Sequence, residues 1–218
     1  MEKEKEIEFI GRITAGATHE YMNVFATIRE ASGLMEDILS MDLESTFPHK
    51  VKFSEKISAV LEQVNRGMEI STNLNTFAHS MDESKVQIEV NDLLAQFAYF
   101  MRHFLRINKI KLTVEPVEPP LTIYTDPFRL LLVLTTCLEF LLNKINDQDM
   151  IVLKCTRSEK GVAIQYTSRH DLSLIENGNE LPEGLMDLKD TLERLDARIV
   201  HVNLDNQFGL EIILPESI

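Results

Sequence analysis

Residues 11–39 read GRITAGATHEYMNVFATIREASGLMEDIL, and the spacing of their apolar residues predicts the structure of the N-terminal part of the chain. With Ala17 at heptad position d, nine of the ten a and d positions between Ile7 and Ile38 are apolar or aromatic. This spacing predicts one long amphipathic helix over 4–39. Further apolar residues stand at the e and g positions, which makes the stripe wider than a two-stranded coiled coil needs: Ile13, Phe25, Leu34 and Leu39.

A second helix is expected over 54–78, after a connection at 40–52 that contains Phe47-Pro48. Two helices joined by a loop form an antiparallel hairpin. A lone hairpin would leave much of both apolar stripes uncovered. The favoured interpretation is therefore a homodimer, in which a second copy of the chain completes a four-helix bundle. The alternative is that the stripes pack on the C-terminal half of the same chain.

The sequence changes character near residue 82, where strand-like and helical segments begin to alternate. Strands are predicted at 85–90, 109–115, 123–125, 150–156, 162–167, 198–204 and 208–214. The last four form two hairpins that turn at 158–161 and at 205–207. Helices are predicted at 91–107, 127–145 and 184–197, the first capped by Asn91 and the second by Asp126, with Pro127 at its first position. This order predicts an α+β sandwich, a mixed sheet covered on one face by about three helices.

Composition and charge exclude several classes of protein. The chain has 218 residues, of which 22 are Lys or Arg and 35 are Asp or Glu, so its formal net charge is −13. Apolar residues make up 44%, which suits a globular protein with a sizeable core. An acidic chain without a basic stripe repels a phosphate backbone, so no nucleic-acid partner is expected.

The chain is expected to be cytoplasmic. Its first nine residues, MEKEKEIEF, are too charged for a signal peptide. The longest apolar run, at 130–142, is interrupted by two threonines and a glutamate, so no membrane insertion is predicted. The two cysteines, Cys137 and Cys155, lie in apolar runs and are predicted to be reduced core residues.

His19 stands at heptad position f, opposite the apolar stripe, and should be exposed on the first helix. Asn23 is four residues further on, one turn along the same face. Glu20 can accept the Nδ1–H of His19, which leaves Nε2 as the electron-rich nitrogen. A neutral imidazole of this kind is a competent phosphoryl acceptor. The alternative is an incidental surface histidine, but the small or uncharged neighbours Ala15, Gly16, Met22 and Ala26 favour a surface that a partner approaches closely.

The stretch 11–39 resembles the H-box helix of bacterial sensor histidine kinases, in which a His is followed by Glu and, four positions on, by Asn or Thr. The resemblance implies that His19 is the phosphorylated residue, Glu20 its acid/base partner and Asn23 the position that orients water in dephosphorylation. It also implies a dimeric four-helix bundle and a response-regulator receiver domain as partner.

Residues 125–145, TDPFRLLLVLTTCLEFLLNKI, resemble the family's nucleotide-binding segment D-P-x-R-L-x-Q-V-L-x-N-L-x-x-N-A. Six positions at the start of the motif match: Asp126, Pro127, Arg129, Leu130, Val133 and Leu134. Its two asparagines are replaced by Thr136 and Phe140, and the second of them is the family's Mg²⁺ ligand. An aromatic ring cannot coordinate Mg²⁺, which demands oxygen donors.

The family's two glycine motifs are also degenerate. In place of D-x-G-x-G the chain has Ser-Arg-His-Asp-Leu at 168–172, and in place of G-x-G-L it has Glu-Gly-Leu-Met-Asp-Leu at 183–188. Only Gly184 remains, and two carboxylates stand where phosphate charge would lie. Neither Asp171 nor Asn143 is taken as a ligand. No cofactor is expected in this chain, and the Mg²⁺ for phosphoryl transfer is expected on the receiver.

The sequence therefore predicts two domains: a dimerisation and histidine-phosphotransfer hairpin at 1–81, and a degenerate histidine kinase ATPase-like domain at 82–218. The predicted function is a phosphorelay step in which His19 accepts and donates a phosphoryl group, with ATP binding lost. Two alternatives stay open: a sensor kinase transmitter with a divergent ATP site, and a non-catalytic dimeric interaction module. The other five histidines show no metal-ligand spacing, so no metal site is predicted.

Overall fold

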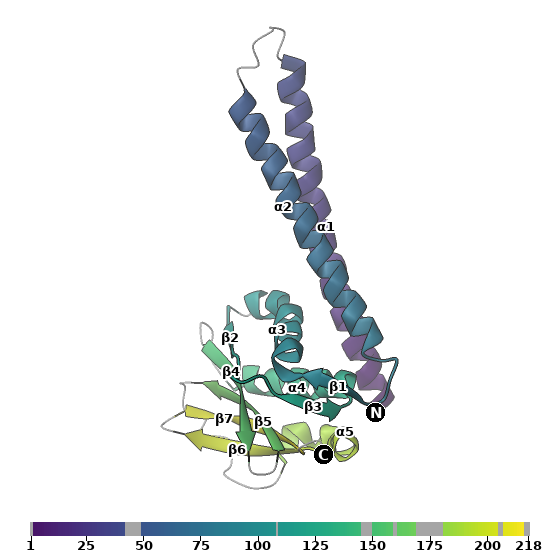
Figure 1. Cartoon of the computed structure of the whole chain (residues 1–218), viewed down its shortest axis with the longest axis vertical. Coiled ribbons are helices and arrows are strands. Elements are labelled where there is room, and N and C mark those ends of the chain that lie inside the picture. Colours follow the sequence, from purple (N-terminus) through teal and green to yellow (C-terminus); the bar gives the residue numbers. More distant parts are fainter. Residues whose placement is uncertain are drawn as a thin grey trace. The chain divides into compact units, whose positions relative to one another are not determined.

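The computed structural model describes residues 2–41, 49–107, 109–144, 150–158, 161–168, 181–204 and 207–215. It divides into two compact units, which are treated separately: 12–78 is the hairpin unit, and 1–11 together with 79–218 is the C-terminal unit. Figure 1 shows the elements of both units.

The hairpin unit is formed by two long helices, α1 (Glu2–Met41) and α2 (Lys50–His79), which lie side by side (Figure 1). Both predicted helices are confirmed, and α2 begins at Lys50, inside the segment expected to be a connection. Most of that connection, including Phe47-Pro48, lies outside the described residues.

The seam between the two helices is narrow. Ile13, Val24 and Ala31 of α1 are buried, as are Ile70 and Phe77 of α2. A further pair sets how closely the helices approach. A Cβ built on Gly67 would lie 3.6 Å from Cγ1 of Val24, in ordinary van der Waals contact. The Tyr21 hydroxyl and the Ser71 hydroxyl share a hydrogen bond one turn further along α2.

The C-terminal unit contains a five-stranded sheet and a two-stranded one. The main sheet has the order β2-β4-β5-β7-β6, in which β2 and β4 are parallel and the other neighbours antiparallel; β1 and β3 form the antiparallel pair. The strands are β1 (Val86–Glu89), β2 (Lys111–Glu115), β3 (Thr122–Thr125), β4 (Met150–Ser158), β5 (Gly161–Ser168), β6 (Arg198–Leu204) and β7 (Gln207–Pro215). Both hairpins are confirmed, and so is the mixed sheet.

Helices α3 (Val90–Ile107), α4 (Pro127–Leu142) and α5 (Lys189–Leu195) cover this sheet, with the 3₁₀ helix η1 (Glu183–Leu188) leading into α5 (Figure 1). The predicted α+β class is confirmed. Helix α4 is the core element, since eleven of its residues are buried. The hydroxyl of the buried Tyr166 on β5 donates to the Leu134 carbonyl, 2.9 Å away, and so ties the sheet to α4.

The predicted N-terminal caps of α4 and α3 have different outcomes. Asp126 caps α4 as predicted, because its carboxylate accepts the Arg129 backbone N–H at 2.9 Å. The prediction that Asn91 caps α3 is wrong. Helix α3 begins at Val90, and the Asn91 amide instead donates to the Val117 carbonyl and accepts the Val117 N–H, at 3.1 and 3.0 Å. The side chain therefore holds a distant loop.

The first turns of α1 belong to the C-terminal unit. Phe9 is only 2% exposed, and its ring centroid lies 5.7 Å from that of Phe128 on α4. Two ion pairs flank this contact: Lys5 with Asp187 at 2.8 Å and Glu6 with Arg129 at 3.7 Å. The Lys5 ammonium lowers the pKa of the Asp187 carboxyl by hydrogen bonding and by its charge.

Both cysteines are buried and unpaired, which confirms the prediction that they are core residues. Burial raises the pKa of the Cys155 thiol to about 11, and it raises the pKa of Cys137 as well. Among the described residues, no helix combines the length and the hydropathy required to cross a bilayer.

Candidate functional site

His19 lies on the exposed surface of α1, as its heptad position predicts. Ile13 and Val24 of the same stretch are buried, and Val24 faces Gly67 of α2. The imidazole is therefore carried by a rigid helix while its ring stays within reach of a partner. A side chain fixed on a helix is placed more reliably than one on a loop, which suits a nucleophile that must meet a partner's reacting atom.

Asn23 holds the ring of His19. Its Nδ2 lies 3.2 Å from Nδ1 of His19, one helical turn away. The two ends of an asparagine amide have the same shape, and turning the amide places Oδ1 at this position instead. Oδ1 then accepts the Nδ1–H, and Nε2 keeps its lone pair. This is the tautomer that an attack through Nε2 requires.

Glu20 lies against α2. Its side chain is 12% exposed, and its Oε2 is 3.6 Å from Nη2 of Arg66. Sequence reasoning placed Glu20 at Nδ1 of His19, and the structure puts the Asn23 amide at that atom. Arg66 was not among the predicted site residues. The sequence held one indication of such a partner. Glu20 is the only Asp, Glu, Lys or Arg between Arg12 and Arg29, so a compensating cation had to come from another segment.

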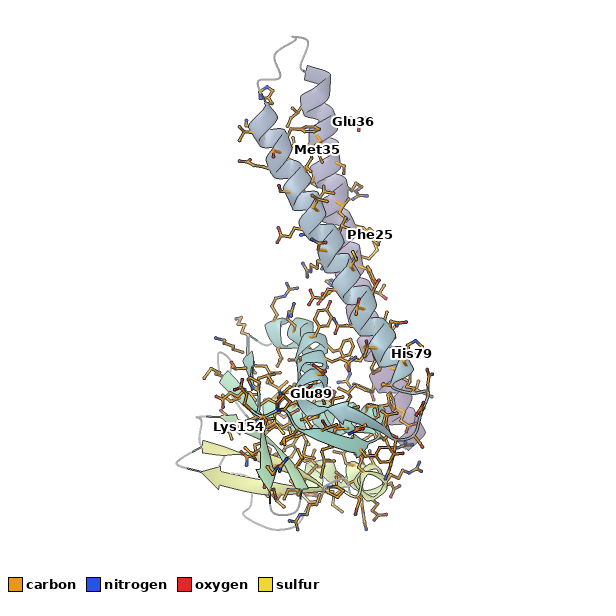
Figure 2. The ribbon with its side chains drawn as sticks, in the orientation of Figure 1. Phe25, Met35, Glu36, His79, Glu89 and Lys154 are labelled. Atoms are coloured by element: carbon orange, nitrogen blue, oxygen red, sulfur yellow. The ribbon has the colours of Figure 1, made fainter. Side chains whose placement is uncertain are left out.

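The exposed α1 residues nearest His19 along the helix carry no charge. We call the exposed residues Ala15, Thr18, Met22 and Ala26, together with His19 itself, the His19 face. The Thr18 hydroxyl donates to the Thr14 carbonyl at 2.8 Å, so it is satisfied within its own helix. Beside this face the Phe25 ring, labelled in Figure 2, is 59% exposed and stacks on Tyr21. Such a surface offers close approach with little polar desolvation.

Among the described residues no three metal-binding side chains converge. His79 pairs with Asp82 at 2.6 Å, and His49 is exposed. Burial lowers the pKa of His201.

No protein-family model matches this sequence, and no curated protein matches it. Among solved structures, the nucleotide-free catalytic domain of the histidine kinase ThkA aligns with a TM-score of 0.50 and 12% identity, over 62% of this chain and 100% of that one. The chain contains the fold of a histidine kinase catalytic domain.

Longer histidine kinase structures align over more of the chain. A histidine kinase from Burkholderia phymatum STM815 covers 92% of this chain and 98% of its own, with a TM-score of 0.49 and 11% identity. ThkA in complex with the response regulator protein TrrA covers 97% of this chain and 63% of its own, with a TM-score of 0.47 and 16% identity.

Within this histidine kinase fold, two of the segments that resemble the nucleotide motifs pack on each other through the Phe140 ring. A Cβ built on Gly184 would lie 2.8 Å from Cε2 of Phe140, so the ring packs directly on the glycine of η1. Nζ of Lys144 lies 5.9 Å from the centre of the same ring. The Thr136 hydroxyl donates to the Leu132 carbonyl within α4. Residues 169–180, including His170 and Asp171, lie outside the described residues.

Proposed function

We propose that this chain is a phosphotransfer protein of two-component signalling, in which His19 accepts a phosphoryl group from the aspartyl phosphate of a receiver domain and passes it to another receiver. The observation that carries the proposal is the exposed imidazole of His19, held at Nδ1 by Asn23 in the middle of the uncharged His19 face. The resemblance of 11–39 to the H-box helix supports the same role.

The chemistry requires little from this chain beyond position. Nε2 of His19 attacks the phosphorus, an N–P bond forms, and the P–O bond to the receiver's carboxylate breaks. The ring keeps its Nδ1 proton and donates it in a hydrogen bond to the Asn23 oxygen. The phosphorylated ring is therefore positively charged, and this charge offsets the negative charge of the phosphoryl group. The receiver supplies the Mg²⁺ and the acidic pocket. Catalysis is then mostly positioning, as in other phosphoryl transfers.

The proposal includes the loss of ATP binding. A nucleotide site of this fold needs an oxygen ligand for Mg²⁺ on α4 and space for phosphates beside the following glycines. Here the position of the ligand is Phe140, and its ring occupies the space against Gly184. Asp187 adds a carboxylate, which is paired with Lys5. These contacts support a C-terminal unit, within the proposed domain 82–218, that is kept as a scaffold.

The proposal also includes a homodimer formed through the hairpin at 1–81. One stripe of α2 carries exposed apolar side chains at helical spacing: Ile57, Leu61, Val64 and Met68. On α1 the exposed Phe25 and Leu34 add to the apolar surface. Contiguous apolar surface of this kind marks an interface. A second copy of the hairpin would cover it as a four-helix bundle.

The decisive experiment measures phosphoryl transfer from receiver domains carrying a radiolabelled aspartyl phosphate, with the receivers of the source organism screened for the fastest exchange. We expect the label to appear on the parent chain and then on a second receiver. Replacement His19→Ala should reduce both steps at least ~100-fold, because the nucleophile is removed. His49→Ala is the matched control, since His49 is another exposed histidine of the same unit. Transfer that survives in His19→Ala would refute the proposal.

A further inference from the structure

The charge of the site is carried by one side chain of α1. From 13 to 28 the helix contains a single acidic residue, Glu20, and no Lys or Arg. This carboxylate directly follows His19. The position where a phosphoryl group would arrive is therefore next to the only fixed negative charge of this stretch.

A second helix supplies the compensating charge. Nη2 of Arg66 on α2 lies 3.6 Å from Oε2 of Glu20, and the carboxylate side chain is 12% exposed while that of Arg66 is 41% exposed. A carboxylate that is mostly removed from water needs a cation or hydrogen-bond donors. Arg66 is suited to this, because its guanidinium stays charged at every relevant pH. Its exposure also leaves it within reach of a bound partner.

The packing of the seam explains why Arg66 is found there. The next residue, Gly67, allows α2 to come close to Val24, with only 3.6 Å between a built Cβ and the Val24 side chain. The hydrogen bond between Tyr21 and Ser71 fixes the same register one turn further on. Glu20, Tyr21 and Val24 thus face the segment 66–71 of α2. The Arg66 guanidinium is placed by this close approach.

The partner's chemistry makes neutrality useful. An aspartyl phosphate is a dianion, and the proposed receiver surrounds it with carboxylates. This chain itself carries a net charge of −13, so it repels that dianion at long range. An uncompensated carboxylate beside His19 would add a repulsion at the point of contact, where the charges are closest.

We propose that Arg66 is a positioning residue for phosphoryl transfer: it neutralises Glu20, so that the His19 face and the neighbouring Glu20 together present no net charge to the phosphorylated aspartate of the receiver. The inference rests on the proposed function and concerns the same site. Arg66 acts through the charge of Glu20, and its effect belongs to the binding of the receiver more than to the chemical step.

The test compares charge states of the site. We would titrate the full chain with the beryllofluoride-loaded receiver, a stable mimic of the aspartyl phosphate, at low and high salt. Arg66→Gln leaves a charge of −1 and should weaken binding about fivefold at low salt. Arg66→Lys keeps the charge and should stay within about twofold of the parent. Arg29→Gln removes an exposed arginine elsewhere on α1 and is the matched control.

The double variant separates charge from structure. Glu20→Gln with Arg66→Gln restores a neutral site, and it should bind the receiver about as well as the parent, even if its transfer step is slow. Glu20→Gln alone should bind more tightly than the parent. All differences should shrink toward ~1 M salt, where screening acts over about 3 Å. A merely structural Arg66 would leave the double variant as weak as Arg66→Gln, at either salt concentration.

The two proposals fail in different ways. Should the parent chain not bind or exchange phosphate with any receiver, the proposed function is wrong. Should the parent bind and His19→Ala stop transfer, while Arg66→Gln binds like the parent, only the role of Arg66 is overturned. If Arg66→Gln does not fold, as judged by its circular dichroism, the tighter binding expected of Glu20→Gln still decides the matter.

Discussion

The His19 face of α1 and the α4–η1 region both resemble parts of a histidine kinase, and they differ in what surrounds the critical position. At His19 the ring is exposed, lies against the Asn23 amide and is flanked along α1 by small uncharged residues. At Phe140 the position is occupied by an apolar ring pressed against Gly184. A site that meets a partner needs access, whereas a site that encloses a ligand needs empty space and polar donors.

The residues of the α4 segment are accommodated within the fold. The Phe140 ring packs on Gly184, and the Thr136 hydroxyl donates a hydrogen bond to the Leu132 carbonyl. The scaffold of the C-terminal unit is then maintained by α4 and the sheet, through contacts such as Tyr166 to Leu134. Four substitutions test these two regions and their surroundings.

The largest effect is expected in the exposed stripe of α2. Leu61→Asp places a charge where the proposed dimer is dry, and it should weaken dimerisation by about 3 kcal/mol or more. Leu61 is 58% exposed in the single chain, so helix content should be unchanged. Sedimentation of the full chain over a range of concentrations measures the change.

Ser58→Asp is the control for Leu61→Asp, since Ser58 is an exposed position beside the stripe on the same helix. An equally weakened dimer in both variants would point to general repulsion. A parent chain that sediments as a monomer would contradict the proposed bundle.

The second effect concerns the filled region. Gly184→Ala adds a methyl group 2.8 Å from the Phe140 ring and should lower the free energy of unfolding by about 2 kcal/mol. Phe140→Leu in the same chain should relieve part of this cost, because the smaller side chain can yield. Urea unfolding of the four variants gives the coupling. Purely additive changes would mean that the ring and the glycine do not press on each other.

The same preparations test the nucleotide. A ligand that binds only the folded state must raise the melting temperature. We expect ATP with Mg²⁺ to leave the melting temperature of the parent unchanged. A clear rise would favour the sensor kinase alternative and remove the contrast between the two regions.

The third effect separates function from stability at His19. Asn23→Ala removes the group at Nδ1 and should slow transfer about tenfold, or ~1.4 kcal/mol, with no comparable loss of stability. Asn73→Ala is the matched control, because the Asn73 amide also bonds within its helix, to the Glu69 carbonyl. If the chain drains phosphate by hydrolysis, Asn23→Ala should also lengthen the lifetime of the phosphorylated receiver. Equal transfer rates in the parent and Asn23→Ala would deny Asn23 a role.

The smallest effect is electrostatic. The pKa of Asp187 is depressed by Lys5, so this ion pair contributes stability above the ordinary carboxyl value of 3.8 and loses it as the pH falls through the lower, folded value. Lys5→Ala should raise the Asp187 pKa toward 3.8. Carboxyl titration by nuclear magnetic resonance measures it. An Asp187 pKa that is the same in the parent and in Lys5→Ala would show that the ion pair does not form in solution.

Local patterns predicted most of the fold. The heptad spacing predicted α1 and the exposure of His19, and Asp126-Pro127 predicted the start of α4. Asn91 misled because its partner, Val117, is 26 residues away, and no local signal distinguishes a cap from a long-range clamp. Arg66 was missed for the same reason: its partner lies on the other helix.

The site itself was predicted in part. The pattern His-Glu-x-x-Asn predicted that Asn23 lies beside His19, because side chains four residues apart on a helix are neighbours. The neighbours of Glu20 depend on how two helices pack, which heptads constrain only loosely. The roles of His19, Glu20 and Asn23 in phosphoryl transfer stay predictions.

The contacts of Lys5, Glu6 and Phe9 have a practical meaning for anyone who dissects the gene. A fragment that starts at residue 82 would expose the Phe128 ring to solvent. It would also lack the ion-pair partners Lys5 of Asp187 and Glu6 of Arg129. Such a fragment should aggregate more readily and be less soluble than the full chain. A fragment of this unit would need the octapeptide Glu-Lys-Glu-Lys-Glu-Ile-Glu-Phe in addition, supplied in trans or grafted through a linker.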